Sequence, residues 1–455
     1  MTELVERVLG LVGGRGEADV VADRTNLELT RFANSFIHQN VSDSGTRLRL
    51  RVHVDGRTAT GTTTRTDSES LAAFVEQTIA QAKVCPPDPG WPGLAGPAPL
   101  PSAGNSDPET VSAGPDARAR QVRAFVDAAG GLVTAGYCRT VGQQVTYGST
   151  AGQLVTGTSS SAAMDAIARA VSGADGVARW SGVSLSGLDG ARLGAIAAAK
   201  ARASEGATEL EPGRYEVVLE PAAVLDVLGF LSSYGFNGKA VAEGRSFLRP
   251  GERQFDPSIT LADDPEDPEA VGLPFDVEGT PKRRLELVTA GVSQGPIHDR
   301  RTAYAAGAGA TSTGHGNEES SRWGPAAANL LLEPGTTPAK AVGGPVASDA
   351  VGGLVGGVER GLLVTDFWYT RVLDPRSVAV TGLTRNGVWL IEDGVITRPV
   401  RNMRFTQSYP EALAPGSVLG IGSEAVSLPL NWALGTVRAP ALRLASWNFT
   451  GGASG

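Results

Sequence analysis

The spacing of apolar residues predicts a two-stranded hairpin near the N-terminus. In the segment 47–54 every second residue is apolar, and the other face carries three arginines and a histidine. This two-residue period is typical of a β-strand with one buried face. Asp55-Gly56 follows, a dipeptide that favours a tight hairpin turn. The threonine-rich segment 58–66 is therefore expected to be the return strand.

The rest of the N-terminal half alternates between helical and strand patterns. Apolar residues at helical spacing, with Asp67 as a cap for the second helix, predict helices over residues 3–12, 67–84, 116–129 and 188–203. Apolar and β-branched runs predict two short strands over 27–32 and 36–41, and three or four strands between 132 and 170.

Prolines divide the chain. Seven of them lie between residues 86 and 101, so we expect 86–115 to be a proline- and glycine-rich linker or a covering segment. The predicted units are an N-terminal α/β domain (1–85), a middle α/β segment (116–210) and a β-rich C-terminal domain (211–455).

In the C-terminal unit, a strand over 214–219 leads into Pro221, which fits the first position of a helix that is apolar on most sides. A second Asp-Gly hairpin is expected at 393–394, and the pattern shows no long helix beyond Gly235. A short one is expected near 347–355. The fold class is α+β, with helices and an antiparallel sheet in the N-terminal half and a barrel-like or sandwich C-terminal half.

Charge and composition narrow the class of protein. Lys and Arg number 40 against 48 Asp and Glu, so the net charge is −8. An acidic chain without basic runs is not expected to bind nucleic acid or an anionic membrane. No secretory leader or long apolar stretch is present, and Cys85 and Cys138 are the only cysteines. We therefore expect a cytoplasmic protein.

Catalytic motifs are scarce. The four histidines lack H-E-x-x-H spacing, and neither a CxxC pair nor a P-loop occurs. The segment 291–295 matches G-x-S-x-G, but Pro296 follows it, which favours a plain glycine turn. The acidic segment 263–267 is compatible with a cation site, but its proline favours a solvated loop. In 313–319, His315 precedes two glutamates on a glycine-rich stretch that disfavours the helix needed to bring them together.

The face that carries Arg47, Arg49 and Arg51 has two interpretations. It could bind a carboxylate or line a polar chamber, or it could be a solvated face of the sheet.

The order of several segments resembles the TldD/PmbA (TldD/TldE) family over nearly the whole chain. The N-terminal segments are Asp23-Arg24-Thr25, Leu27-Glu28-Leu29, Phe36-Ile37-His38-Gln39 and 45–52. The C-terminal segments are 244–248, 261–265, 275–281, 313–316, 329–335, 360–365 and 390–400.

The resemblance implies a heterodimeric metallopeptidase for unfolded peptides and small proteins. TldD-like subunits carry an H-E-x-x-x-H zinc motif and a C-terminal cysteine ligand, and TldE-like subunits lack both. The segment that looks like the zinc helix here is 224–231, which has no histidine and a single acid, Asp226. Both cysteines lie before residue 140. This chain therefore resembles the metal-free subunit, with no metal ligands, no catalytic residues and no cofactor of its own, and zinc is expected in the partner.

The leading hypothesis is a non-catalytic TldE-like subunit that pairs with a zinc-bearing TldD-like homologue and helps to hold unfolded peptides. The candidate substrate-binding residues are Arg47, Arg49, Arg51, His315 and Asn317. The alternative is a stand-alone peptide-binding homodimer without proteolytic activity. A third hypothesis is a hydrolase that uses His315 with Glu318 or Glu319. The sequence indicates no group that would orient these side chains.

Overall fold

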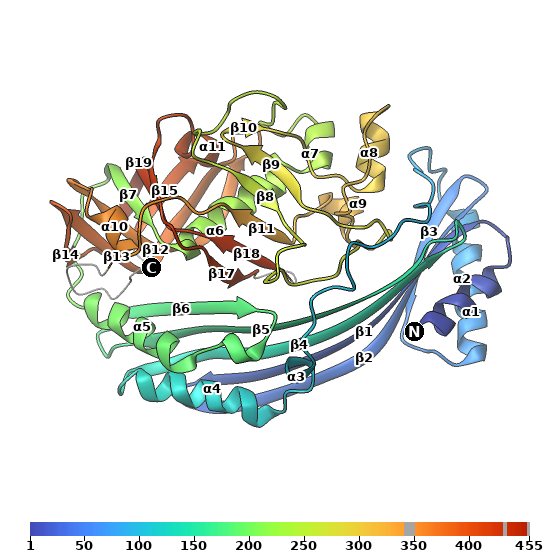
Figure 1. Cartoon of the computed structure of the whole chain (residues 1–455), viewed down its shortest axis with the longest axis horizontal. Coiled ribbons are helices and arrows are strands. Elements are labelled where there is room, and N and C mark those ends of the chain that lie inside the picture. The colour runs from blue at the N-terminus through green and yellow to red at the C-terminus, as the bar shows by residue number, and fades with distance from the viewer. Residues whose placement is uncertain (341–350, 431–434, 453–455) are drawn as a thin grey trace.

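The N-terminal half is built on one antiparallel sheet. The structure, a computed structural model, describes residues 1–340, 351–430 and 435–452. In this sheet the strand order is β3-β2-β1-β4-β5-β6. The strands are β1 (Glu17–Ala33), β2 (Phe36–Val54), β3 (Arg57–Thr63), β4 (Val133–Ser149), β5 (Leu154–Arg169) and β6 (Asp175–Gly182). The sheet curves, with its helices on the outer side and the C-terminal half of the chain on the inner side (Figure 1).

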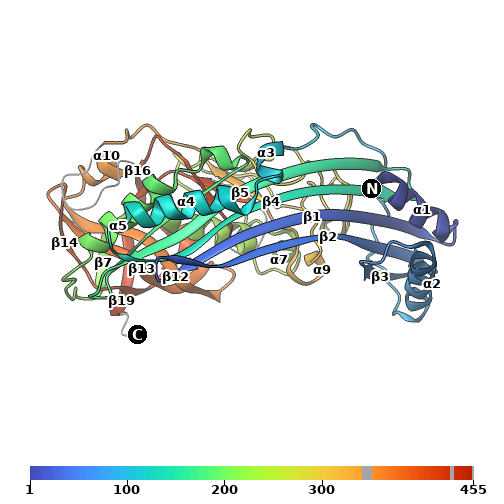
Figure 2. The same ribbon diagram turned by 90° about the horizontal axis from the view of Figure 1, so that it is seen from below.

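Helices cover the outer face (Figures 1 and 2). At one end lie α1 (Thr2–Val12) and α2 (Ser68–Val84), and from the middle towards the other end lie α3 (Pro108–Val111), α4 (Pro115–Ala128) and α5 (Gly190–Ala203). The α1–α2 pair packs on Leu48, Leu50 and Val52 of β2, which are fully buried. The alternation over 47–54 is thereby confirmed, and so is the cap, because the Asp67 side chain accepts the Ser70 N–H.

The predicted short strands are parts of longer ones. The segments 27–32 and 36–41 belong to β1 and β2, which pair continuously from Glu17↔His53 to Arg31↔Gln39. Two long strands, β4 and β5, occupy the region for which three or four were expected. The strands are longer than predicted because they pair with their neighbours across the sheet. This pairing extends them through polar stretches that show no hydrophobic period of their own.

The C-terminal half contains two further sheets and short helices. One sheet has the order β10-β9-β8-β11-β18-β17, and the other has β12-β7-β19-β15-β13-β14, with β16 beside β19. The strands are β7 (Gly213–Leu219), β8 (Leu261–Asp263), β9 (Leu285–Thr289), β10 (Val292–Ser293), β11 (Asn329–Leu332), β12 (Arg360–Asp374), β13 (Ala379–Glu392), β14 (Val395–Pro399), β15 (Met403–Ser408), β16 (Val418–Ile421), β17 (Val426–Pro429), β18 (Thr436–Ala439) and β19 (Leu442–Gly452).

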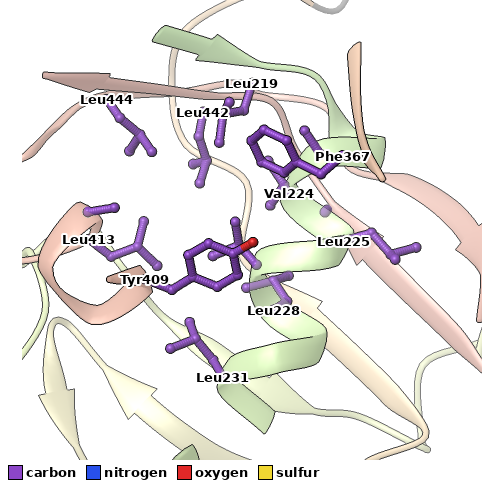
Figure 3. Close-up of a cluster of buried hydrophobic side chains, with 14 of the residues drawn as sticks. Leu219, Val224, Leu225, Leu228, Leu231, Phe367, Tyr409, Leu413, Leu442 and Leu444 are labelled. Atoms are coloured by element: carbon purple, nitrogen blue, oxygen red, sulfur yellow. The ribbon is translucent and has the colours of Figure 1, made fainter. Parts of the chain in front are cut away.

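The second of these sheets closes on itself, because β12 also pairs with β13. The result is a ring of five strands, β12-β7-β19-β15-β13, which accords with the predicted α+β class and its barrel-like C-terminal half. Helix α6 (Pro221–Phe230) packs against it, and a buried cluster that includes Leu228, Phe367 and Tyr409 fills the space between them (Figure 3). Pro221 occupies the first turn of α6, as predicted.

The other C-terminal helices are short. They are α7 (Gly238–Ala242), α8 (Arg300–Ala306), α9 (Ser320–Trp323), α10 (Gly352–Val355) and α11 (Tyr409–Ala412). Helix α10 lies within the short helix expected near 347–355, of which 347–350 are outside the described residues. In the described part of the chain, none of the helices combines the length and the apolar character needed to cross a bilayer.

Candidate functional site

The arginine row of β2 lies on the inner face of the sheet and contacts loops of the C-terminal half. The Nε of Arg51 donates to Oδ2 of Asp19, its neighbour on β1, at 2.7 Å. Its Nη1 donates to Oε1 of Glu278 at 3.0 Å. Burial opposes the charge on Arg51, but the two carboxylates outweigh it and raise the pKa of Arg51 above its ordinary value.

The other two arginines of the row contact the same loops. Arg49 is buried, and its Nη2 donates to the Val277 carbonyl oxygen at 2.6 Å. Arg47 forms two hydrogen bonds with the Glu318 carboxylate, at 2.8 and 2.7 Å, and its side chain stays 45% exposed. The interpretation as a solvated sheet face is therefore wrong for Arg49 and for Arg51. The carboxylates that neutralise this row come from segments far away in the sequence.

The side chain of His315 is fully buried. Its Nε2 lies 2.9 Å from Oδ2 of Asp263, and its Nδ1 lies 2.9 Å from the Thr313 hydroxyl. The other Asp263 oxygen accepts the backbone N–H groups of Ala328 and Asn329. Burial opposes ionisation of Asp263, but the hydrogen bond and charge of His315 and the Asn329 N–H lower its pKa.

Two expectations change with this geometry. Asp263 and Asp264 are buried, so the interpretation of 263–267 as a solvated loop is wrong for its first two residues. Asp263 is the last residue of β8 and Asp264 follows it, and the pairing of β8 with β11 carries this end of the strand into the interior. The His315 ring has no contact with solvent in this chain, so a hydrolytic role would require the loop to open.

Asn317 organises its own loop. Its Nδ2 donates to the Gly324 carbonyl oxygen at 3.1 Å, and its Oδ1 accepts the Glu319 N–H at 2.9 Å. Nearby, the buried carboxylate of Asp276 accepts the Gly316 N–H at 2.8 Å. Burial first, and then the charge of Glu278, raises the pKa of Asp276 to about 7.

The structure thus brings the five candidate residues together at one junction between the sheet and the C-terminal loops. Sequence reasoning missed three carboxylates there, Asp19, Asp276 and Glu278. The available signal was the run 275–278, in which acidic residues alternate with apolar ones. All five candidate residues have partners within this chain, and Arg47 is the one that is most open to solvent.

Residues 86–107 form a covering segment, here called the strap, across the same junction. Asp88 forms a bidentate ion pair with Arg301 on α8, at 2.9 and 2.8 Å. Trp91 stacks on His53 with ring centroids 4.7 Å apart, and Arg51 lies over the same indole. The strap thus contacts both β2 and α8.

Asp226 lies on α6, the segment that resembles the zinc helix. Its Oδ1 accepts the Thr370 hydroxyl at 2.8 Å, and its Oδ2 accepts the Tyr409 hydroxyl at 2.6 Å. The Tyr409 ring is packed among leucines, including Leu228 and Leu413 (Figure 3). Burial in these surroundings raises the pKa of Asp226 to about 7.

These surroundings do not fit a zinc ion. Zinc is bound by histidine, cysteine and ionised carboxylates, and α6 offers Asp226 alone, with both oxygens already hydrogen-bonded. Across the described ranges, no group of three His, Cys, Asp or Glu side chains is arranged to hold a metal ion.

Comparison with known structures agrees with this fold. TldE from Thermococcus kodakarensis superimposes with a TM-score of 0.85 at 19% identity, over 99% of both chains. A candidate modulator of DNA gyrase from Thermotoga maritima gives 0.82 at 18% identity, covering 98% of this chain and 99% of that one. A similarly described protein from Bacteroides thetaiotaomicron gives 0.82 at 21% identity, covering 99% of this chain and 98% of that one.

Family models cover more than half of the sequence. Residues 212–451 match the PmbA/TldA metallopeptidase C-terminal domain, and residues 18–82 match domain 1 of the same family. A comparison with curated proteins finds no match. The family predicted from the order of the sequence segments is confirmed: the chain belongs to the PmbA/TldD family of metallopeptidases.

Proposed function

We propose that this chain is the metal-free, TldE-like subunit of a cytoplasmic two-chain zinc metallopeptidase that degrades unfolded peptides and small proteins. The observation that supports this proposal most directly is the set of side chains on α6. Where metal-bearing members of the family have zinc ligands, this chain has one buried aspartate held by two hydroxyl groups. A carboxyl with a pKa near 7 in an apolar cluster is a poor zinc ligand at neutral pH.

In this proposal the partner subunit supplies zinc and the chemical step. This chain shapes the chamber and helps to hold the extended substrate. The likeness to a protein named TldE supports this division of roles, because it extends over the full length of both chains.

We place the contact with the partner on an exposed aromatic surface of β12. Trp368 and Tyr369 are 49% and 65% exposed. Arg385 lies 4.2 Å from the centroid of the Trp368 ring, and Arg371 lies 4.5 Å from that of Tyr369. Tryptophan, tyrosine and arginine are the residues that most often dominate the energy of protein interfaces.

The backbone of this surface supports the assignment. Tyr369 has a φ of 54°, a left-handed conformation that non-glycine residues adopt only where the surroundings stabilise it. The β-bulge between Trp368 and Arg371 presents the tyrosine to solvent and turns Thr370 towards Asp226. The partner surface is thus joined directly to the buried site on α6.

The test is affinity purification of the tagged chain from its native cytoplasm, followed by a proteolysis assay. We expect a stoichiometric homologue that carries H-E-x-x-x-H. The pair should degrade fluorescein-labelled casein, this chain alone should not, and a chelator should abolish the activity. A homodimer without such a homologue would overturn the proposal in favour of a stand-alone peptide-binding protein. Degradation of casein by this chain alone would overturn it as well.

A further inference from the structure

One long sheet edge of the N-terminal half has no neighbouring strand among the described residues. Residues 36–47 of β2 pair with β1 on one side, whereas β3 pairs with β2 only over 48–54. Figure 2 shows β3 beside just one end of β2. In the described part of the chain no strand pairs with the other side of 36–47. Every second residue of such an edge directs its N–H and C=O groups outward.

Between Gln39 and Arg47 this edge has little of the usual protection against added strands. Natural edges are blocked by lysine, proline or bulges, and the segment 36–47 contains neither lysine nor proline. Its register with β1 shifts once, at His38, and is regular from Gln39 to Arg47. Nine of its twelve residues are exposed and three are half-buried.

An open pocket of about 480 Å³ lies beside the edge, on the outer face of the sheet. Its wall is the segment 111–115 after α3, and its floor is a ladder of polar side chains on β1 and β2. In this ladder Ser44 donates to Asn26 at 2.7 Å and Ser42 donates to Glu28 at 2.6 Å. The side chain of Asn40 accepts a hydrogen bond at 2.7 Å from Thr30, which is buried and does not line the pocket. These cross-strand hydrogen bonds hold the floor side chains on the sheet.

A buried cation of α4 lines the pocket and contacts its floor. Arg118 is fully buried, and it donates to Glu28 at 3.1 Å and to the Ala113 carbonyl oxygen at 2.9 Å. It thereby links the pocket wall to the floor. The pocket is therefore held in place from both sides, as expected of a binding site that exists before its ligand arrives.

We propose that the free edge of β2 and this pocket bind an extended polypeptide segment as an added strand. Main-chain hydrogen bonds to 36–47 would provide affinity, and side chains on one face of the added strand would enter the pocket. The inference rests on the proposed function for its class of ligand, an unfolded peptide. Most of the affinity comes from the backbone, so the site accepts many sequences.

The surroundings favour a transient peptide over a permanent subunit. Permanent interfaces have an apolar core, whereas the pocket floor is composed of serine, asparagine and glutamate side chains. Among the described residues of 36–47, Phe36 is the one large apolar side chain that is strongly exposed.

The experiment measures fluorescence anisotropy of a fluorescein-labelled peptide of alternating threonine and valine, titrated with the full-length chain. Two further probes carry N-methyl groups on alternate residues, along one edge or along the other. A strand that pairs through one edge should lose affinity about tenfold or more with one methylated probe and keep it with the other. Failure of the unmodified probe to bind, or equal loss with both methylated probes, would overturn the proposal.

Protein variants test the location of the site. Ser44→Trp fills the pocket and should weaken binding of the unmodified probe about tenfold or more. Ser172→Trp is the matched control, because both serines are exposed and both donate one side-chain hydrogen bond. Equal affinity of the two variants would exclude this edge as the site.

The outcome also separates this inference from the proposed function. Binding is measured without the partner subunit. A chain that co-purifies with a zinc-bearing homologue but does not bind the probe retains the proposed function and refutes the peptide site. If the chain binds the probe but no such homologue co-purifies, the peptide site is retained and the proposed function is refuted.

Discussion

Replacing Asp226 with asparagine tests whether the buried site on α6 holds a neutral carboxyl. Asp226 is enclosed by the apolar cluster around Tyr409, and its pKa is raised to about 7 from an ordinary 3.8, mainly by burial. Asparagine has nearly the same shape, carries no charge at any pH and keeps one acceptor oxygen. The variant should therefore mimic the protonated aspartate.

The expected effect depends on pH in a defined direction. Below about pH 4 the carboxyl is protonated in both the folded and the unfolded chain, so its ionisation does not change the free energy of unfolding. As pH rises towards 7 the unfolded chain ionises first, and the folded state loses stability. One pKa unit corresponds to about 1.4 kcal/mol, so a pKa difference of about three corresponds to about 4 kcal/mol of folding stability. This stability is lost in full above about pH 7. Asp226→Asn removes this loss.

The assay is urea unfolding of the wild-type chain and the variant at intervals from about pH 4 to about pH 8. The two free energies of unfolding should agree at the acidic end, and the variant should be more stable by up to about 4 kcal/mol at the alkaline end. Asp43→Asn, on the exposed edge of β2, controls for the substitution itself. A difference that does not change with pH, or a variant less stable than wild type at about pH 8, would refute the reasoning.

Three further predictions concern the junction, the strap and the partner surface. Arg51→Met leaves the buried Glu278 carboxylate without its cation and leaves Asp19 with Arg49 alone, so the free energy of unfolding in urea should fall by about 3–5 kcal/mol; the exposed Arg31→Met should change it by no more than about 0.5 kcal/mol. Arg301→Ala removes the bidentate ion pair of the strap, so limited proteolysis followed by mass spectrometry should show faster cleavage within 86–107, and an unchanged rate would contradict this. Trp368→Ser should weaken partner binding about tenfold or more in surface plasmon resonance, whereas Trp323→Ser, another exposed tryptophan beneath an arginine, should not.

Local chemistry determined much of the fold from the sequence alone. The alternation over 47–54 correctly placed Leu48, Leu50 and Val52 in the core. The Asp67 cap, Pro221 at the start of α6 and the Asp55-Gly56 turn depend on neighbours within a few residues, so they are visible in a short window of sequence. The family was also apparent from the order of its segments.

Only the tertiary structure decided what the polar residues do. The sequence shows Arg49 and Arg51 on one face of a strand, but Glu278 lies 227 residues away from Arg51, and no local pattern connects them. The same holds for Asp226, whose hydroxyl partners Thr370 and Tyr409 lie 144 and 183 residues further along the chain.

The free edge of β2 is the clearest case of this division. The sequence predicts a strand over 36–41 alone, and whether a neighbour covers the edge 36–47 depends on where β3 ends and where the C-terminal half packs. Strand pairing joins residues that are distant in sequence, and their contacts are selected by the stability of the whole fold. The sequence alone therefore determined the elements and the family, whereas the tertiary structure decided which charges are neutralised within the chain and which sheet edge stays open.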